Sequence, residues 1–256
     1  MEGATMRPIY RSQGQALYQG DCLTVLAELK KKGQQFDGLI TDPPYSSGGL
    51  HTGSRQAATS SKYQSSDAKK KLPDFLGDNM DQRSYRAWAT LWLAEALETL
   101  KPGGIVCLFT DWRQLPTMSD ILQGAGVTWQ GVASWDKGNS RPRLGGISQR
   151  CEFVVWGSKG KLERKGPSLS GAFRFGIVPS SRRVHCAEKP LDLMAELLRL
   201  IAWREGASVL DPFAGSGSTL VAARQLGVNA VGIEKSPEIA QIARERLEGQ
   251  AVAVAA

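Results

Sequence analysis

The feature that most constrains the fold is a glycine-rich turn between an apolar segment and a helical one. Residues 208–210 are typical of a short buried strand, 211–217 read Asp-Pro-Phe-Ala-Gly-Ser-Gly, and 218–226 have a helical period. Glycines in such a turn let backbone N–H groups and a helix N-terminus approach a polar ligand closely. The next predicted strand, 229–233, ends at Glu234, where a carboxylate can bind two ribose hydroxyls. The pattern predicts a nucleoside site.

Apolar segments of strand and helix character alternate along most of the chain. This alternation predicts an α/β fold, a mostly parallel sheet with helices on both faces. The length of 256 residues suits a single domain. Two segments lack the pattern: 46–80, expected to be a flexible loop, and 157–184, expected to be an inserted surface segment. The predicted strands are 16–18, 36–41, 105–109, 127–135 and 153–156, and the predicted helices are 22–29, 85–100, 115–122, 190–201 and one from Pro237.

The glycine turn itself favours one class of nucleoside. A phosphate-binding loop needs a lysine before its Ser or Thr, and here Gly217 precedes Ser218. A dinucleotide fingerprint needs a third glycine, and Leu220 occupies that place. S-adenosylmethionine, which has a ribose and a carboxylate but no phosphate, suits the turn better. Taken alone, the turn is equally compatible with a purely structural connection.

A second motif, Asp42-Pro43-Pro44-Tyr45, ends the strand predicted at 36–41, because two prolines cannot continue a sheet ladder. Its side chains suit chemistry on the amine of adenine, whose lone pair is delocalised into the ring. The Asp42 carboxylate and the Pro43 carbonyl could each accept one N–H and bend the nitrogen toward tetrahedral geometry. Pro44 stiffens the turn, and Tyr45 can stack on a base taken out of the duplex. The alternative is a rigid turn without chemistry.

With both motifs in this order, the chain resembles the β group of amino-methylating DNA methyltransferases, in particular small phage-like or orphan adenine enzymes. The resemblance spans most of residues 16–247. It includes Gly20-Asp21-Cys22, which is similar to the family segment that contacts the cofactor adenine, and the segment from His185 to Pro190. That last segment departs from the family, which usually has Pro-Thr where Cys186-Ala187 stand.

The resemblance implies a circularly permuted, Rossmann-like class I S-adenosylmethionine-dependent methyltransferase fold with a seven-stranded sheet. It implies methyl transfer from this cofactor to adenine N6, with Lys189 on the cofactor carboxylate and Glu234 on its ribose. Asp42 favours adenine over cytosine, because cytosine-amine members commonly begin the tetrapeptide with Ser. The implied catalytic residues are Asp42, Pro43, Pro44 and Tyr45, and the implied cofactor residues are Asp21, Cys22, Lys189, Asp211, Pro212, Phe213, Ala214, Gly215, Ser216, Gly217, Ser218, Thr219 and Glu234.

Positive charge is concentrated in one window of the chain. Of the +7 net charge, residues 137–189 contribute twelve Lys or Arg against three Glu, which is typical of a protein that binds a polyanion. A solvated basic surface is the alternative. We expect a DNA-recognition insert over about 137–188, with the 46–80 loop closing over the flipped base. The candidate DNA-binding residues are Lys62, Arg141, Arg143, Arg182 and Arg183.

The cysteines, histidines and apolar runs indicate which ligands and which cellular location to expect. Four separated cysteines and two histidines without ligand companions predict no metal site and no disulfide. No apolar run is long enough to span a membrane and the start does not look like a secretory signal, so we expect a cytoplasmic, bacterial or phage-encoded protein. The expected partner is double-stranded DNA, and a homodimer is a hypothesis. The alternatives are an N4-cytosine enzyme, an RNA or protein-amide methyltransferase, and a silent DNA-binding regulator.

Overall fold

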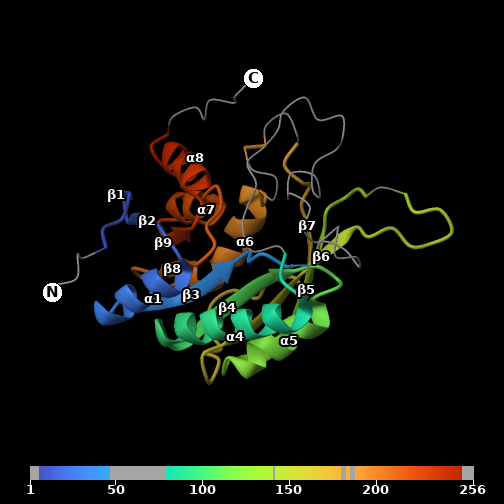
Figure 1. Ribbon diagram of the computed structural model, residues 1–256, viewed down its shortest axis with the longest axis horizontal. Coiled ribbons are helices and arrows are strands. Elements are labelled where there is room, and N and C mark those ends of the chain that lie inside the picture. The colour runs from blue at the N-terminus through green and yellow to red at the C-terminus, as the bar shows by residue number, and fades with distance from the viewer. Residues whose placement is uncertain (1–5, 47–78, 141, 180–182, 185–187, 250–256) are drawn as a thin grey trace.

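The computed structural model describes residues 6–46, 79–140, 142–179, 183–184 and 188–249. Within these residues one mixed sheet has nine strands in the order β1-β2-β9-β8-β3-β4-β6-β5-β7 (Figure 1). The strands are β1 (Tyr10–Ser12), β2 (Gln15–Gln19), β3 (Phe36–Thr41), β4 (Leu100–Thr110), β5 (Thr128–Asp136), β6 (Cys151–Ser158), β7 (Ala172–Arg174), β8 (Ser208–Asp211) and β9 (Asn229–Glu234).

The centre of the sheet is parallel, from β2 through β9, β8 and β3 to β4. Strand β6 then runs antiparallel between β4 and β5. Because β8 and β3 are neighbours, the connections that follow Asp211 and Thr41 leave the same edge of the sheet. In open parallel sheets ligands bind at this carboxyl-terminal edge.

Helices cover both faces of the sheet (Figure 1). On one face α1, α4 and α5 pack on a core that contains Trp92, Leu26 and Ile121. On the other face α6, α7 and α8 pack on a second core that contains Leu197, Leu220 and Ala243. The helices are α1 (Cys22–Lys31), α4 (Gln82–Glu98), α5 (Leu115–Gly124), α6 (Leu191–Ala202), α7 (Ser218–Gln225) and α8 (Pro237–Leu247).

Local sequence explains where several of these elements begin and end. Asp21 caps α1 by accepting a hydrogen bond from the Leu23 N–H at 3.1 Å, and Asp81 caps α4 in the same way. A side-chain oxygen at this position satisfies one of the N–H groups that have no partner within the helix. Strand β3 is buried along its whole length and stops at the two prolines. The strand therefore delivers Asp42 to the edge of the sheet.

Three sequence predictions need correction. The sheet has nine strands in the described residues rather than seven, because β1 and β7 add short edge strands of three residues each. Segment 157–184 is not a simple surface insert, since it contains β7 and its Phe173 is buried. Residues 101–104 were predicted to lie between a helix over 85–100 and a strand over 105–109, but they belong to β4, which already begins at Leu100. Single apolar residues between polar ones produce no period from which such elements could be read.

Two further sequence expectations meet the structure only in part. The loop predicted over 46–80 lies almost wholly outside the described residues, at 47–78. Among the residues that are described, no helix is long and apolar enough to cross a membrane.

Candidate active site

The two motifs meet where β3 and β8 end side by side. Gly38 pairs with Val209 and Leu39 with Leu210 in the sheet. Beyond these pairs, where the two strands end, the Thr41 hydroxyl donates to the Asp211 carboxylate at 2.6 Å. The Thr219 hydroxyl, from the first turn of α7, donates to the other oxygen of that carboxylate. Asp211 is the first residue of the glycine turn. Its carboxylate therefore connects this turn to β3, the strand that leads to Asp42.

A cavity of about 390 Å³ lies between the two turns. Its volume is in the range of small-molecule sites. Asp42, Pro43, Pro44 and Tyr45 line one part of it. Every residue predicted for the cofactor also lines it except Gly217, namely Asp21, Cys22, Lys189, Asp211, Pro212, Phe213, Ala214, Gly215, Ser216, Ser218, Thr219 and Glu234.

The glycine turn is held by its backbone and by one aromatic anchor. Gly217 is the N-cap of α7 with φ 83°, a left-handed conformation that favours glycine. A Cβ at this position would also lie 3.3 Å from the Cβ of Ala243 on α8. Phe213 packs edge-on against Trp92, with ring centroids 4.8 Å apart, and against Trp88 at 5.6 Å. Trp88 itself lines the cavity.

Glu234, at the end of β9, lines the side of the cavity where the residues predicted for the cofactor lie. Its carboxylate accepts backbone hydrogen bonds from Gly215 at 3.0 Å and Ser236 at 2.7 Å. Burial raises the pKa of Glu234, and the two backbone donors partly offset that effect. Each carboxylate oxygen retains acceptor capacity for a further donor. The side chain is therefore fixed in place and still able to bind hydroxyl groups.

The first turn of α1 forms the adjoining wall. The Asp21 carboxylate, besides capping the helix, forms an ion pair with Lys235 at 3.0 Å. Burial raises the pKa of the Cys22 thiol to about 12, with Asp21 adding to the effect. Cys22 is therefore a neutral wall residue near pH 7 and not a nucleophile.

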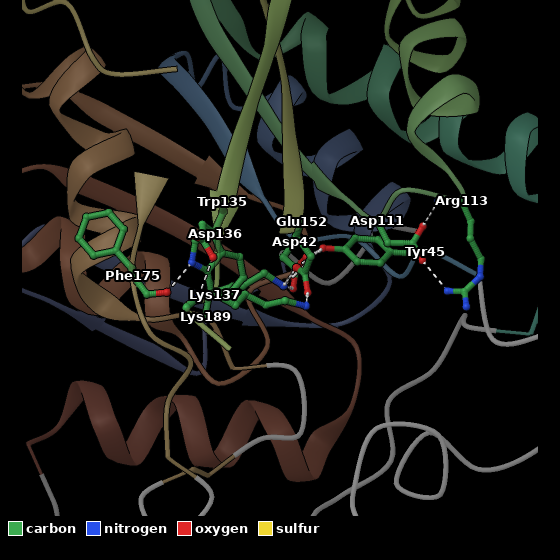
Figure 2. A network of polar contacts seen from close by, with 11 residues as sticks. Asp42, Tyr45, Asp111, Arg113, Trp135, Asp136, Lys137, Glu152, Phe175 and Lys189 are labelled. Atoms are coloured by element: carbon green, nitrogen blue, oxygen red, sulfur yellow. Dashed lines mark hydrogen bonds and ion pairs between the residues drawn. The ribbon is translucent and has the colours of Figure 1, made fainter. Parts of the chain in front are cut away.

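On the catalytic side, Asp42 belongs to a compact charged network (Figure 2). Its carboxylate accepts hydrogen bonds from the Tyr45 hydroxyl and from the Lys189 ammonium. Glu152, on β6, lies 3.5 Å from the same ammonium and 3.4 Å from the Tyr45 hydroxyl. Lys137, just after β5, pairs with Glu152 at 3.2 Å. Two carboxylates and the Lys189 ammonium thus lie around the Tyr45 hydroxyl, and Lys137 contacts the group through Glu152.

Burial and charge act in opposite directions on this network. Burial raises the pKa of Asp42; Lys189 offsets part of the rise and Glu152 adds to it. Burial also disfavours the charged form of Glu152, yet Lys189 and Lys137 together hold its pKa below the usual range. For Lys189 the two carboxylates outweigh burial and raise its pKa. Burial raises the pKa of Tyr45 well above its ordinary value, so its hydroxyl stays protonated.

Comparison with known proteins identifies the family of this arrangement. The model of a DNA methylase family, the N6 and N4 methyltransferases, matches residues 36–245. The chain belongs to this family. The type II methyltransferase M2.DpnII of Streptococcus pneumoniae is 25% identical over 264 residues, which cover 95% of this chain and 93% of that protein.

Solved structures show the same fold for this DNA methylase. The S-adenosylmethionine complex of M1.HpyAVI has a TM-score of 0.67 and 23% identity, covering 91% of this chain and 98% of that one. The PvuII DNA methyltransferase, which is cytosine-N4-specific, has a TM-score of 0.68 and 16% identity, covering 94% and 88%. The class I methyltransferase fold predicted from the sequence is therefore confirmed.

The predicted DNA-binding residues of the methylase fall in different places. Arg183 lines the cavity and donates to the Val178 carbonyl at 2.8 Å. Arg143 lies exposed in the loop between β5 and β6. Lys62, Arg141 and Arg182 are outside the described residues, as is the segment 185–187 that contains Cys186 and Ala187. The structure thus brings Arg183, but not Arg143, to the site.

Two charged residues of the methylase site were missed in the sequence. Glu152 lies on β6 and Lys137 directly after β5. Both strands are far from the two motifs along the sequence, so no spacing relates these residues to Asp42. A signal for Glu152 does exist: it is a single acidic residue directly before the apolar run Phe153-Val154-Val155-Trp156, and a carboxylate withdrawn from water requires partners. Of the two tryptophans that contact Phe213, Trp92 is fully buried, whereas Trp88 is partly buried and lines the cavity.

Proposed function

We propose that this DNA methylase transfers a methyl group from S-adenosylmethionine to the N6 amine of an adenine flipped out of double-stranded DNA. The observation that carries the proposal is the shared cavity, in which Asp42 and the glycine turn face the same space. A base amine held at Asp42 would there be close to a cofactor held at the turn, and such proximity supplies a large part of enzymatic rate enhancement.

The cofactor side of the cavity fits S-adenosylmethionine, which would supply an activated methyl group on its sulfonium. Glu234 has spare acceptors for ribose hydroxyls, and the turn from Asp211 to Thr219 contains no Lys or Arg for a phosphate. Lys189 was predicted to bind the cofactor carboxylate. Its ammonium has Asp42 and Glu152 as partners, so that role requires it to exchange a partner when the cofactor binds.

The catalytic side fits an exocyclic amine. One N–H would donate to the Asp42 carboxylate and the other to the Pro43 carbonyl, which directs the nitrogen lone pair toward the cofactor. The ring of Tyr45 offers a surface on which the extruded base can stack. When the nitrogen forms its bond to the methyl carbon, the bond from that carbon to the sulfonium sulfur would break, and the sulfur would leave as a neutral thioether. The methylated amine must then release a proton, which the Asp42 carboxylate, already accepting one of its N–H groups, would take up.

Adenine is preferred over cytosine because the tetrapeptide begins with Asp42 rather than with the Ser common among cytosine-amine enzymes. The similar PvuII enzyme is cytosine-N4-specific, so N4 methylation of cytosine is the second candidate.

The proposal includes the basic 137–188 segment as DNA-recognition region and a cytoplasmic location. It also includes the homodimer, which light scattering would exclude if a fully active protein had the mass of a monomer.

The test is to express the chain in a bacterial host that lacks base methylation and to map methylated bases in its DNA. We expect N6-methyladenine at one short sequence. Asp42→Ala should abolish the modification while purified protein still binds a duplex with that sequence. Asp120→Ala, which removes an exposed carboxylate on α5, is the matched control and should methylate normally. Methylcytosine alone would support the second candidate, and full activity of Asp42→Ala would refute the mechanism.

A further inference from the structure

We propose that Leu144 and Ile147, at the tip of the hairpin formed by β5 and β6, insert as an apolar wedge into the base stack of duplex DNA beside the flipped nucleotide. This inference rests on the proposed function and assigns a role to a surface that the catalytic chemistry does not use. The hairpin loop, residues 137–150, is described except for residue 141. It projects beyond the ends of β5 and β6, away from the body of the sheet (Figure 1).

The tip exposes apolar side chains to an unusual degree. Leu144 is 98% exposed and Ile147 is 83% exposed, whereas the next most exposed large apolar side chain among the described residues, Leu91, reaches 52%. Leu144 lies in a closed turn, because the Gly146 N–H donates to the Arg143 carbonyl at 3.2 Å. Gly145, with φ 66°, supplies the left-handed conformation that this turn uses. Leu144 is thus presented outward by a defined turn.

The stem of the hairpin connects this tip to the active site. The Lys137 N–H donates to the Arg150 carbonyl at 3.2 Å, and Arg150 forms an ion pair with Asp136 across the hairpin. Lys137 and Glu152, on the two arms of the stem, both line the catalytic cavity. A base held at Asp42 would therefore lie against the stem while the tip extends toward the rest of the duplex.

Charge indicates DNA as the occupant of this surface. Residues 137–150 contain four Lys or Arg and no acidic residue. Duplex DNA offers both phosphates for the cations and a stack into which Leu and Ile can be wedged, as apolar side chains of other DNA-binding proteins are. A second copy of the chain would bring the same basic tip, and like charges facing each other disfavour such a contact.

A wedge has a specific energetic role. Extrusion of the adenine breaks its stacking and pairing, and an inserted side chain replaces part of the lost contact. The wedge should therefore matter most when the target base is paired, and little when it is already unpaired. A side chain that only strengthens DNA binding would affect both substrates equally.

The test uses the Leu144→Ser/Ile147→Ser double variant on two duplexes that contain the mapped recognition sequence. One has the target adenine paired, and the other has an abasic site opposite it. We expect kcat/KM on the paired duplex to fall about tenfold or more, and on the abasic duplex by less than about twofold. With 2-aminopurine in place of the target adenine, the fluorescence rise that reports base extrusion should be reduced.

Two controls separate the wedge from other roles. Leu226→Ser removes an apolar side chain that is 39% exposed beside the end of α7, and it should leave both rates unchanged. Arg143→Ala, which removes a cation from the same tip, should lower kcat/KM equally on both duplexes. Equal rates of the double variant and wild type, an equal loss on both duplexes, or conversion of a dimer to a monomer would overturn the wedge. An inactive wild type would instead contradict the proposed function.

Discussion

Glu152 places a second, partly buried carboxylate beside Asp42, and both carboxylates interact with the same ammonium, that of Lys189. The Lys189 ammonium lies between the two carboxylates, so a stronger interaction of Lys189 with Glu152 weakens its interaction with Asp42. In the proposed mechanism, a base amine competes with Lys189 and Tyr45 for the Asp42 oxygens. Glu152 acts through these neighbours and is a positioning residue in this arrangement.

Glu152→Gln should therefore change the pH dependence of methyl transfer. The negative charge of Glu152 raises the pKa of Asp42, and its removal also leaves Lys189 to Asp42 alone, so both effects lower that pKa. If transfer requires ionised Asp42, the acid limb of the kcat/KM profile moves to lower pH. Because Lys189 then holds Asp42 more firmly, kcat at neutral pH should fall, with KM for the cofactor little changed.

The measurement is initial methylation rate from about pH 5 to 8 for wild type and variant. Glu163→Gln is the control, because Glu163 pairs with Arg204 and Lys165 outside the cavity and lies more exposed. An acid limb that stays in place while activity falls at every pH would mean that Glu152 is only structural.

Asp211 provides a separate test of the buried charge at the centre of the site. Burial raises the pKa of Asp211 to about 6, although the Thr219 and Thr41 hydroxyls favour its charged form. Because this pKa is above the unfolded value of about 3.9, the folded state binds the extra proton and the stabilisation is lost as pH rises from about 4 to 6. Relative to Asp211→Asn, wild type should lose roughly 2 kcal/mol of unfolding free energy over that window. Urea titrations at several pH values check this, and a constant difference would contradict it.

At the scale of elements, α7 has a left-handed glycine at each end, and only one end touches the site. Gly217 has φ 83° and Gly227 has φ 68°, and a Cβ at Gly227 would meet nothing within 4 Å. Gly217→Ala and Gly227→Ala should each lower the unfolding free energy by roughly 1–2 kcal/mol through backbone strain. Only Gly217→Ala should also weaken S-adenosylmethionine binding, because it displaces the turn. Calorimetric titration of both variants checks this, and equal affinities would show that the turn does not position the cofactor.

Local sequence was enough to predict the elements that border the site. Strand β3 was predicted at the residues that form it because its apolar run ends at two prolines. The glycine turn and α7 were predicted for a similar reason: glycine and a change of period mark the boundary. In both motifs, the prolines or glycines that determine the local backbone conformation are therefore part of the motif itself.

What could not be predicted depends on contacts between distant strands. Strand β7 is three residues long and exists because it pairs with β5, so its own sequence shows no strand pattern. Glu152 meets Lys189 only because β6 runs antiparallel to β4, which places its first residues at the catalytic edge. Register across a sheet is a property of the whole fold, and spacing along the chain does not reveal it.

At the scale of the molecule, the cavity joins parts of the chain that would otherwise be independent. The wall proposed for the cofactor combines the turn after β2, the turn after β8 and the end of β9. The wall proposed for catalysis adds the end of β3 and the stem of the hairpin. These elements contribute to both cores of the sheet. A ligand that contacts all of them binds the folded chain and not the unfolded one.

S-adenosylmethionine should therefore stabilise the entire fold. At a hundredfold excess over Kd the gain is about 2.7 kcal/mol, which corresponds to a rise in Tm of roughly 5–10 °C for a chain of this size. Glu234→Gln should lose most of this rise, because it weakens the grip on the ribose, whereas Glu205→Gln, at an exposed site, should keep it. ATP should give no rise, since the turn offers no cation to its phosphates. Thermal melts with each ligand test this prediction. An equal rise in Tm with ATP would mean that the cavity binds nucleotides in general and does not distinguish S-adenosylmethionine.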